Sequence, residues 1–534
     1  MRRSHCLMLV LACALLSPPS ASAQVVPPGY RVETFATGLD APCAFEFMPD
    51  GGVLFTEQNT GTVRLVFAGG GAQSAPVIAI AGVATGGERG LLGIALDPQF
   101  PSRPYLYVLH SASAPSRTRI ARYTLNADAH AGGADLAADA ASRLDLLDAI
   151  PDAASNHNGG TLRFASDGTL IASLGDDAVP CGAQDSTGLR GVILRMAVNT
   201  LGNGPGVASI AQLAPLDNPY AASPDSNARL VLARGLRNPF RVQADPSLPW
   251  VMIGDVGDTQ REEFDLLALP SAITLPFGMA RAGANFGWPY REGVVAGSRA
   301  GGCPPAPAAL AGPAFDYDRT SFSSGAAIIA AGYVPSIVTV SIGIQPAPSL
   351  PAGMYFSDYY TGALTRLDIP AGGAAWEIAP AVPGQPSAEH FAEGFKAVAD
   401  WRVRGTELWF VRQSVNFVAN TGAIGRLAAD ALPPPPPPSP PTRPRLVMLG
   451  MPALGQAEFL VVDDSTPPLR LDILDARGRQ LRHYDTGAFG RAPEGLRLTW
   501  DGLDDDGAKA GPGVYWARLT TGGGSRTARV VLLR

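Results

Sequence analysis

The chain has 534 residues and a formal net charge of -6, with acidic and basic residues interspersed along its length. Because no run or patch of basic residues is present, nucleic acid is excluded as the main partner. The 61 glycines and 49 prolines favour many short strands and turns, and the length favours two domains plus extensions.

The N-terminus predicts a cleavable export signal. Two early arginines precede an apolar stretch from Cys6 to Leu16, and the small residues Ala21–Ala23 follow it. This stretch is shorter than the roughly 20 apolar residues that a membrane-spanning helix needs. We therefore predict a signal peptide over residues 1–23, a mature chain that starts at Gln24, a periplasmic or secreted location and no membrane span.

Six segments share one pattern, in which a turn with Asp or Gly leads into an alternating apolar strand, a polar turn and a second strand. They are Pro49–Val66, Pro101–Leu125, Ser166–Met196, Pro246–Leu267, Leu350–Asp368 and Gly405–Leu427. Each segment predicts a β-hairpin. Six hairpins separated by Gly- and Pro-rich insertions indicate an all-β fold, a six-bladed β-propeller, with a large β-sandwich as the alternative.

The segment from Arg319 to Asp358 carries no charge between its ends. Within it, the apolar stretch Ile328–Ile344 could be mistaken for a membrane-spanning helix. Pro335 and several β-branched residues argue against a continuous helix. Two buried strands are therefore expected here.

Three cysteines, Cys43, Cys181 and Cys303, follow the signal segment. An exported chain permits one disulfide among them, and no Cys-x-x-Cys pair is present to build a zinc site. The residues alone leave the pairing open, and our first choice is Cys181 with Cys303.

A proline tract marks a domain boundary. Residues 432–445 are mostly proline and predict a stiff extended linker. The linker separates a propeller over residues 24–431 from a small β-sandwich over residues 446–534. In the second part, Trp500–Gly502 and Gly511–Tyr515 resemble the immunoglobulin-like module of the flagellar hook-capping protein, so this part is expected to be FlgD-like.

The segment Asn156–Leu162 is the sharpest local signal in the sequence. Its histidine, His157, lies between two amides and just before two glycines and a strand. Glycines at such a position let backbone and ligand approach closely. An imidazole is also the side chain best suited to exchange a proton near neutral pH, which makes His157 a candidate general base.

Further motifs accompany this segment in a fixed order along the chain: Glu88–Gly93, Leu236–Pro239, Gly254–Asp258 and Asn285–Pro289. Taken together, they resemble the quinoprotein glucose/sorbosone dehydrogenase family, over nearly all of Gly29–Leu427. The resemblance implies a six-bladed propeller that holds pyrroloquinoline quinone (PQQ) and Ca²⁺ at the mouth of its channel. It also implies an oxidoreductase that acts on an aldose sugar and uses an external electron acceptor.

The resemblance assigns roles to individual residues. His157 matches the catalytic base, which takes the proton of the anomeric hydroxyl while hydride passes to the quinone. Arg237 matches a catalytic group that stabilises charge, and with Asn238 it matches the pair that binds the cofactor. Gly257 and Asp258 match the positions whose backbone carbonyls bind the cofactor's calcium.

Two further positions, Glu88 and Asn156, match residues that contact the substrate. Relative to the glucose-oxidising members of the family, the acid and the amide have exchanged places. The sequence does not say which sugar is bound.

Cations that the family uses for the cofactor are missing. Tyr360 stands where a lysine is expected, and Gly394 begins a stretch that replaces an Arg-x-Arg pair and leaves Lys396 as a cofactor-binding cation. PQQ has three carboxylates, so fewer cations imply weaker binding. Arg402 and Arg404 stay open as replacements.

Three functions remain in view. The first is PQQ- and calcium-dependent oxidation of an aldose at its anomeric carbon to the lactone. The alternatives are a non-catalytic, calcium-containing propeller that binds a glycan or protein partner, and a lactonase-like hydrolase. Nicotinamide, flavin and nucleotide chemistries lack their usual binding motif because no Gly-x-Gly-x-x-Gly or phosphate loop is present. No serine nucleophile elbow is present either.

Overall fold

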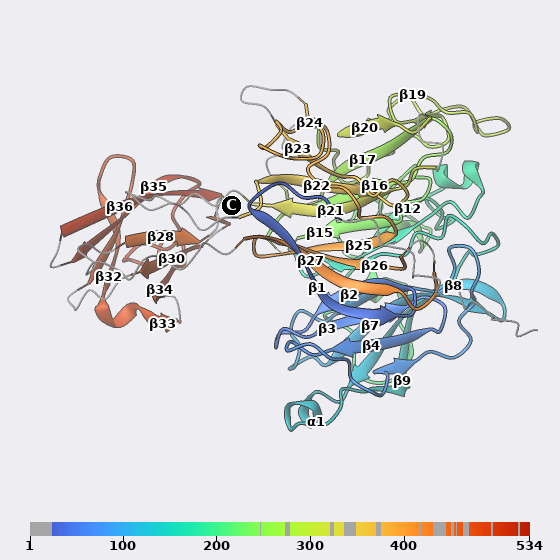
Figure 1. Cartoon of the computed structure of the whole chain (residues 1–534). Coiled ribbons are helices and arrows are strands. Elements are labelled where there is room, and N and C mark those ends of the chain that lie inside the picture. Colours follow the sequence, from blue (N-terminus) through green and yellow to red (C-terminus); the bar gives the residue numbers. More distant parts are fainter. Residues whose placement is uncertain are drawn as a thin grey trace, which may run out of the picture.

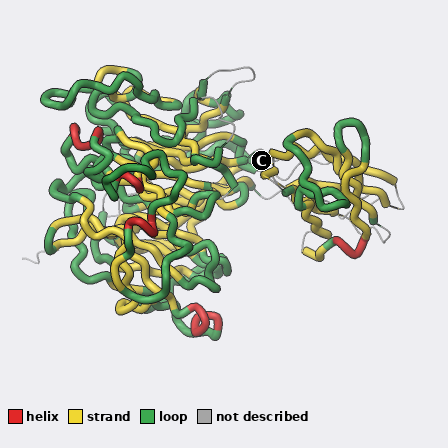
Figure 2. The backbone as a smooth tube through the Cα atoms, turned by 180° about the vertical axis from the view of Figure 1, so that it is seen from behind, coloured by secondary structure: helices red, strands yellow, loops and turns green. Residues whose placement is uncertain are grey.

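The computed structural model describes residues 24–533 except 246, 273–277, 321–324, 336–348, 370–374, 416–417, 431–444, 450–452, 455, 463–468, 493–494 and 522–523. The predicted signal peptide and nearly all of the proline tract therefore lie outside the described residues. The described chain is dominated by β-strands, which confirms the all-β prediction, and its helices are few and short (Figure 2). None of these helices is long and apolar enough to cross a membrane.

Six sheets of four or five strands make up residues 30–429 (Figure 1). The first sheet contains β2 (Pro42–Phe47), β3 (Val53–Glu57), β4 (Thr62–Val66) and β5 (Ile78–Ala79). The second contains β6 (Leu91–Leu96), β7 (Tyr105–Ser113), β8 (Ser116–Leu125), β9 (Ala138–Ile150) and β13 (Gly206–Val207). The third contains β10 (Leu162–Phe164), β11 (Leu170–Leu174), β12 (Val192–Met196) and β14 (Val231–Arg234).

The remaining three sheets repeat this arrangement. The fourth contains β15 (Arg241–Ala244), β16 (Trp250–Asp255), β17 (Arg261–Ala268) and β20 (Phe315–Asp318). The fifth contains β21 (Ile328–Val334), β22 (Gly353–Asp358), β23 (Leu364–Asp368) and β24 (Glu377–Ile378). The sixth contains β25 (Val398–Arg404), β26 (Glu407–Arg412), β27 (Gly422–Ala429) and β1 (Tyr30–Leu39). Neighbouring strands are antiparallel except β9 and β13.

The six sheets form a ring. The strands β2, β6, β10, β15, β21 and β25 contact one another in this order, and β25 also contacts β2. The N-terminal strand β1 completes the last sheet, with Tyr30 opposite Ala429. Each of the six hairpins expected from the sequence forms the second and third strands of one sheet, counted from the strand that lines the centre of the ring, from β3 and β4 to β26 and β27. The hairpin predictions are therefore confirmed.

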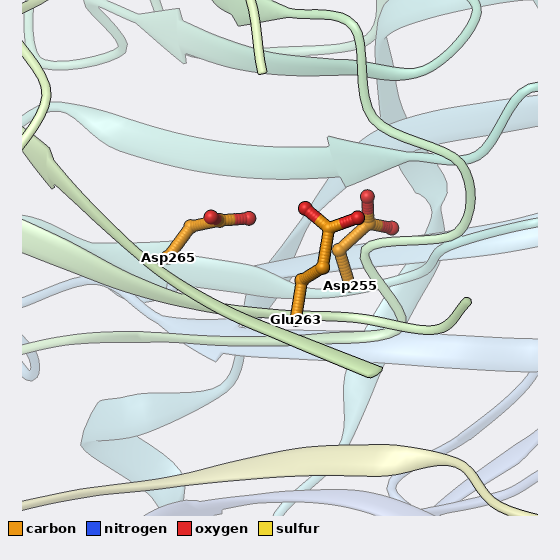
Figure 3. A group of neighbouring side chains, drawn as sticks. All are labelled: Asp255, Glu263 and Asp265. Atoms are coloured by element: carbon orange, nitrogen blue, oxygen red, sulfur yellow. The ribbon is translucent and has the colours of Figure 1, made fainter. Parts of the chain in front are cut away.

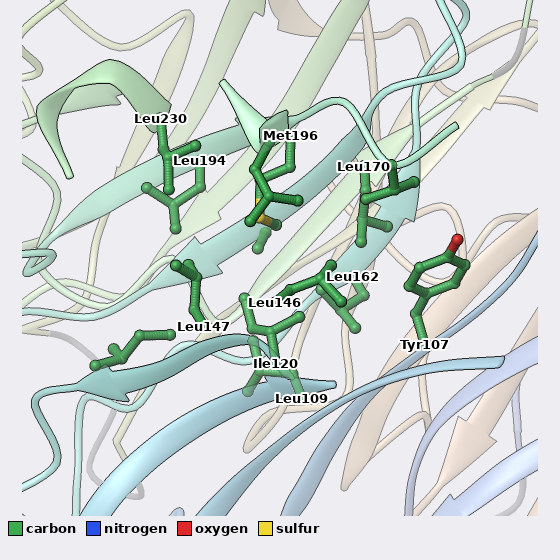
Figure 4. Close-up of a cluster of buried hydrophobic side chains, with 14 of the residues drawn as sticks. Tyr107, Leu109, Ile120, Leu146, Leu147, Leu162, Leu170, Leu194, Met196 and Leu230 are labelled. Carbon is green, nitrogen blue, oxygen red and sulfur yellow. The ribbon is translucent and has the colours of Figure 1, made fainter. Parts of the chain in front are cut away.

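Apolar side chains fill the space between neighbouring sheets. Figure 4 shows one such cluster, in which Leu109 and Ile120 of the second sheet pack against Leu162, Leu170 and Leu194 of the third. These residues are buried and alternate with residues on the opposite face of their strands. The alternation explains why short strands with period-two patterns are visible in the sequence.

Short elements lie in the connections between strands: β18 (Arg291–Glu292), β19 (Val295–Ala296), α1 (Ala127–Ala131), α2 (Ile210–Leu213) and the 3₁₀ helices η1 (Pro180–Gln184) and η2 (Ala228–Leu230). A disulfide joins Cys181 in η1 to Cys303 after β19, so the first choice of pairing is confirmed. Cys43 is buried and free. Of the uncharged segment, Ile328–Val334 is a strand as expected, and residues 336–348 lie outside the described part.

The C-terminal residues form two further sheets, drawn apart from the ring in Figures 1 and 2. One contains β28 (Arg445–Leu449), β30 (Ala457–Val462), β33 (Gly490–Ala492) and β34 (Gly495–Trp500). The other contains β29 (Ala453–Leu454), β31 (Arg470–Leu474), β32 (Gln480–Asp485), β35 (Gly513–Thr521) and β36 (Gly524–Leu533), with η3 (Thr486–Ala488) between β32 and β33. Side chains of both sheets, including Phe459, Trp500 and Val530, share one apolar cluster.

A buried charge network links the inner strands of the ring. Both carboxylate oxygens of Asp400 in β25 accept hydrogen bonds of 2.7 Å from Arg163 in β10. Asp400 also accepts the backbone N–H of Phe45 in β2. Arg241 in β15 lies 3.8 Å from Asp400 and donates to the carbonyl of Cys43 in β2. Burial lowers the pKa of Arg163 to about 10, so its guanidinium stays charged at neutral pH.

Replacement of this carboxylate should destabilise the ring. Asp400→Ala leaves two buried guanidinium groups without their counter-ion, and the expected loss in the free energy of unfolding is about 3–5 kcal/mol. Urea unfolding measures it, with the exposed Asp368→Ala as the matched control. A loss below about 1 kcal/mol for Asp400→Ala would contradict the assignment of Asp400 as the central counter-ion.

Candidate active site

A cavity of about 650 Å³ lies at one end of the ring. Its wall comes from loops that precede the first strand of a sheet or follow the second strand. Because these two strands are antiparallel, both loop types lie at the same edge of each sheet. The lining residues that matter below are Glu88, Asn156, His157, Arg237, Asn238, Gly257, Arg319, Ile329, Tyr359 and Tyr360.

His157 lies in the wall of this cavity, in the loop before β10. Its backbone φ is 59°, a left-handed conformation that costs a residue other than glycine on the order of 1–3 kcal/mol. Its ring nitrogen Nδ1 lies 2.7 Å from a carboxylate oxygen of Asp176, and 12% of its side chain is exposed. A strained, nearly buried histidine at a cavity wall is typical of a functional residue.

Asp176 follows β11 and is completely buried. One carboxylate oxygen pairs with His157, and the other accepts the indole N–H of Trp288 at 2.8 Å. This anchored carboxylate accepts the Nδ1–H of the imidazole, so Nε2 is the ring nitrogen that can take up a proton. Sequence reasoning missed Asp176, because only the fold brings it to His157.

Glycines allow the loops around His157 to pack closely. A Cβ atom added to Gly175 would lie 1.9 Å from the carbonyl oxygen of His157. A Cβ atom on Gly159, whose φ is 65°, would lie 2.7 Å from the carbonyl oxygen of Ser173. Gly159 and Gly175 therefore allow close backbone packing around His157, and for Gly159 the sequence pattern indicated this.

Glu88 holds the histidine loop in place. One of its oxygens accepts the backbone N–H groups of His157 at 2.9 Å and of Asn158 at 3.3 Å, and also the side-chain amide of Asn238 at 3.0 Å. Glu88 and the exposed Asn156 both line the cavity. The structure thus brings both predicted substrate contacts to the cavity and gives Glu88 a positioning role as well.

Arg237 supplies a fixed positive charge beside His157. Its guanidinium donates to the carbonyl of Val256 at 3.0 Å and to the carboxylate of Asp258 at 3.3 Å, and it lies over the ring of Trp288. Its buried Nε has no hydrogen-bond partner among the described residues. Arg237 and Asn238 lie together at the cavity, as the sequence predicted.

A second guanidinium, which sequence reasoning missed, lines the cavity at Gly257. Arg319 donates to the carbonyl oxygen of Gly257 and, at 3.0 Å, to that of Ala326. It also forms an ion pair of 3.1 Å, without hydrogen-bond geometry, with the buried carboxylate of Glu262. Burial raises the pKa of Glu262, while the adjacent guanidinium of Arg319 lowers it and so favours the ionised carboxylate in this pair.

The other predicted cations lie elsewhere. Lys396 is exposed and is not part of the described cavity lining. Arg402 pairs with Glu46 at 2.8 Å, and Arg404 lies over the ring of Phe47. Neither of these arginines lines the cavity. Tyr360 does line the cavity, with 39% of its surface exposed.

Three buried carboxylates gather behind the cavity. Oxygens of Asp255, Glu263 and Asp265 lie within 4.8 Å of one another (Figure 3). Burial raises the pKa of all three groups, and for Glu263 and Asp265 the negative neighbours raise it further. Both oxygens of Asp265 lack hydrogen-bond partners among the described residues. Such a cluster fits a hard cation that prefers oxygen ligands.

This cluster connects to the active-site loop. Asp255 accepts the backbone N–H groups of Arg237 at 2.9 Å and Asn238 at 2.7 Å. None of the three carboxylates is part of the described cavity lining. The cluster therefore orders the loop from behind and does not face a ligand in the cavity.

Asp258 and Gly257 were predicted as ligands of calcium through their backbone carbonyls. The side chain of Asp258 pairs with Arg237 and, at 2.8 Å, with the exposed Arg299. The carbonyl of Gly257 accepts a hydrogen bond from Arg319. The residues present therefore do not fit a calcium ion at Gly257.

Comparison with known proteins places these features in a family. The family model described as Glucose / Sorbosone dehydrogenase matches residues 39–337. The chain is 25% identical over 293 residues to the aldose sugar dehydrogenase YliI of Escherichia coli (strain K12), covering 54% of this chain and 68% of that protein. It is 26% identical over 169 residues to quinoprotein glucose dehydrogenase B of Acinetobacter calcoaceticus, covering 30% and 33%.

Solved structures show the same fold. The PQQ-bound aldose sugar dehydrogenase from Streptomyces coelicolor matches with a TM-score of 0.51 and 22% identity, covering 76% of this chain and 100% of that chain. The apo-form of the soluble aldose sugar dehydrogenase from Escherichia coli matches with a TM-score of 0.51 and 20% identity, covering 75% and 100%. Since the family model spans more than half of the sequence, this chain belongs to the glucose/sorbosone dehydrogenase family.

Proposed function

We propose that this chain is a PQQ-dependent aldose dehydrogenase that oxidises its sugar at the anomeric carbon to the lactone and passes the electrons to an external acceptor. The observation that carries the proposal is the pair of His157 and Asp176 in the wall of a cavity that also holds Arg237. Family membership and the PQQ-bound structural neighbour support it.

The residues around the cavity fit PQQ. The volume of about 650 Å³ lies within the range of small-molecule sites. Arg237, with its unpartnered Nε, and Arg319 supply positive charge for an anionic quinone, while Asn238 and Ile329 complete the polar and apolar walls. When bound, PQQ supplies the electron pair acceptor for hydride from the sugar.

His157 acts as the general base in this proposal. Its Nε2 takes the proton of the anomeric hydroxyl as hydride leaves the same carbon, so that a proton and a hydride depart together and the lactone results. Asp176 holds the Nδ1–H and stabilises the imidazolium that forms. Arg237, in the same cavity lining, would stabilise the negative charge that develops on the cofactor.

Calcium, in this proposal, stabilises the protein from behind the cavity. Asp255, Glu263 and Asp265 fit a calcium ion, and the ion would neutralise three carboxylates that otherwise repel one another. Because Asp255 also holds the backbone of Arg237, the ion would order the loop that carries this arginine.

The rival functions have less support. Tyr360 and Gly394, which stand where the family has cations, favour a non-catalytic propeller that binds a glycan or a protein partner. Arg319, however, supplies one positive charge to the cavity. A lactonase-like hydrolase needs carboxylates around a cation that faces the substrate. The described carboxylate cluster lies outside the cavity lining.

We further propose the domain organisation expected from the sequence: a signal peptide over residues 1–23, a six-bladed propeller over 24–431, a linker over 432–445 and a FlgD-like β-sandwich over 446–534. The ring of six sheets and the shared apolar cluster of the C-terminal sheets support it. Export to the periplasm or the medium is part of the same proposal.

His157→Gln should abolish turnover while the cofactor still binds. Apo-protein supplied with calcium, PQQ and an aldose should reduce an artificial dye, and the substitution should lower the rate by ~100- to 10,000-fold because the general base is lost. His390→Gln, outside the cavity lining, is the control. Retained dye reduction in His157→Gln would overturn the catalytic role, and absence of PQQ binding by the wild type in calorimetry would overturn the function.

Asp176→Asn should lower kcat without unfolding the chain. The amide keeps the shape of the carboxylate but no longer compensates a protonated imidazole, so a decrease of roughly 100-fold or more is expected, with KM changed much less. The exposed Asp185→Asn serves as the matched control. If Asp176→Asn and Asp185→Asn show the same kcat, the carboxylate has no part in catalysis.

Chelation should lower the melting temperature by at least about 3 °C, since an ion that binds only the folded state stabilises it by mass action. This decrease in melting temperature should be larger at higher pH. Without the ion, the folded state keeps protons on Asp255, Glu263 and Asp265 that the unfolded chain has already lost, so its stability falls as pH rises above the ordinary carboxyl pKa.

Scanning calorimetry at about pH 5 and pH 8 measures this effect, and Asp265→Asn should reduce the stabilisation by added calcium. Asp368→Asn, an exposed carboxylate outside the cluster, should respond to calcium as the wild type does. An unchanged melt on chelation, together with no calcium in metal analysis, would argue against the cation site.

A further inference from the structure

We infer that Arg319 replaces the bridging cation at the carbonyl of Gly257, so that this chain binds its carboxylated quinone without a calcium ion between protein and cofactor. The inference rests on the proposed function, since it concerns how the same cavity holds PQQ. It departs from the calcium site that the sequence predicted at Gly257 and Asp258.

The geometry at Gly257 carries the inference. The guanidinium of Arg319 donates to the carbonyl oxygens of Gly257 and Ala326, and all three residues line the cavity. Only 16% of the Arg319 side chain is exposed, so the guanidinium is fixed by packing as well as by hydrogen bonds. A dication at the same carbonyl would lie beside this positive charge in a largely buried place, where repulsion is screened little.

A buried counter-ion holds Arg319 in this position. Glu262 of β17 is completely buried, its Oε1 lies 3.1 Å from Arg319, and its Oε2 accepts the backbone N–H of Ile328 at the start of β21. The carboxylate is thus fixed between two sheets and points at the guanidinium. The arginine is consequently part of the architecture of the cavity wall.

An arginine can perform the task of a bridging cation. Its guanidinium is always charged, and its planar set of donors matches carboxylate oxygens. Two carbonyl oxygens accept hydrogen bonds from part of that set, the carboxylate of Glu262 forms an ion pair with it, and Arg319 also lines the cavity. The same charge also compensates for the cations missing at Tyr360 and Gly394.

The number of calcium ions bound per chain tests the inference, and its measurement does not require removal of metal from the protein. Equilibrium dialysis with radioactive calcium counts the ions per chain before and after saturation with PQQ, while the absorbance of the quinone reports its binding. The wild type should bind PQQ and gain no calcium ion on doing so. Above the calcium concentration that fills the carboxylate cluster of Asp255, Glu263 and Asp265, its affinity for PQQ should change less than about 3-fold with free calcium.

Arg319→Gln should weaken binding of PQQ at low calcium by roughly 10-fold or more, because a charge-assisted contact is lost. If this single variant folds poorly, the double variant Arg319→Gln/Glu262→Gln is measured in its place, because it removes both charges of the ion pair. It should show the same loss of affinity for PQQ. The exposed Arg281→Gln is the control and should bind PQQ as the wild type does.

The possible results distinguish failure of this inference from failure of the proposed function. A gain of one calcium ion per bound quinone in the wild type, with Arg319→Gln binding as tightly as the wild type, would overturn the inference and leave the proposed function intact. No binding of PQQ at any calcium concentration would overturn the proposed function and the inference with it.

Discussion

The buried carboxylate of Asp400 is the interaction on which the ring depends. It pairs with Arg163, lies close to Arg241 and accepts a backbone N–H from Phe45, so a single charged group joins strands of four sheets. A charge inside a protein is costly unless it is paired and hydrogen-bonded. A shift of one inner strand against another would separate these paired groups, so the network favours the observed placement of the strands and of the loops at their ends.

The cavity follows from this arrangement. The histidine loop enters β10, the strand that carries Arg163, and the loop with Arg237 and Asn238 enters β15, the strand that carries Arg241. Glu88 joins these two loops through hydrogen bonds to His157 and Asn238. The groups proposed for catalysis come from distant parts of the sequence and are held close together by the same strands that form the core, which limits their motion.

Much of the fold could be predicted from sequence, because hairpins leave a local pattern of alternating residues and turns. The middle strands of all six sheets follow this pattern. His157 was identified from its local motif, Asn156–Leu162, and Arg237 from the resemblance to the family. Asp176 and Arg319 could not be predicted, because their partners lie 19 and 62 residues away and no local pattern encodes such contacts. Lys396 was predicted to bind the cofactor, yet it is exposed and outside the cavity lining.

The distribution of charge explains why such a departure from a family pattern is tolerated. An anionic ligand needs positive charge at its site, but the charge need not come from one particular residue or from a metal. In this chain Arg319 lies in the connection between β20 and β21 and is paired with Glu262, which is fixed between β17 and β21, so the framework holds the cation. A cation fixed in this way requires little reorganisation when a ligand binds, which compensates for the smaller number of positive groups around the cavity.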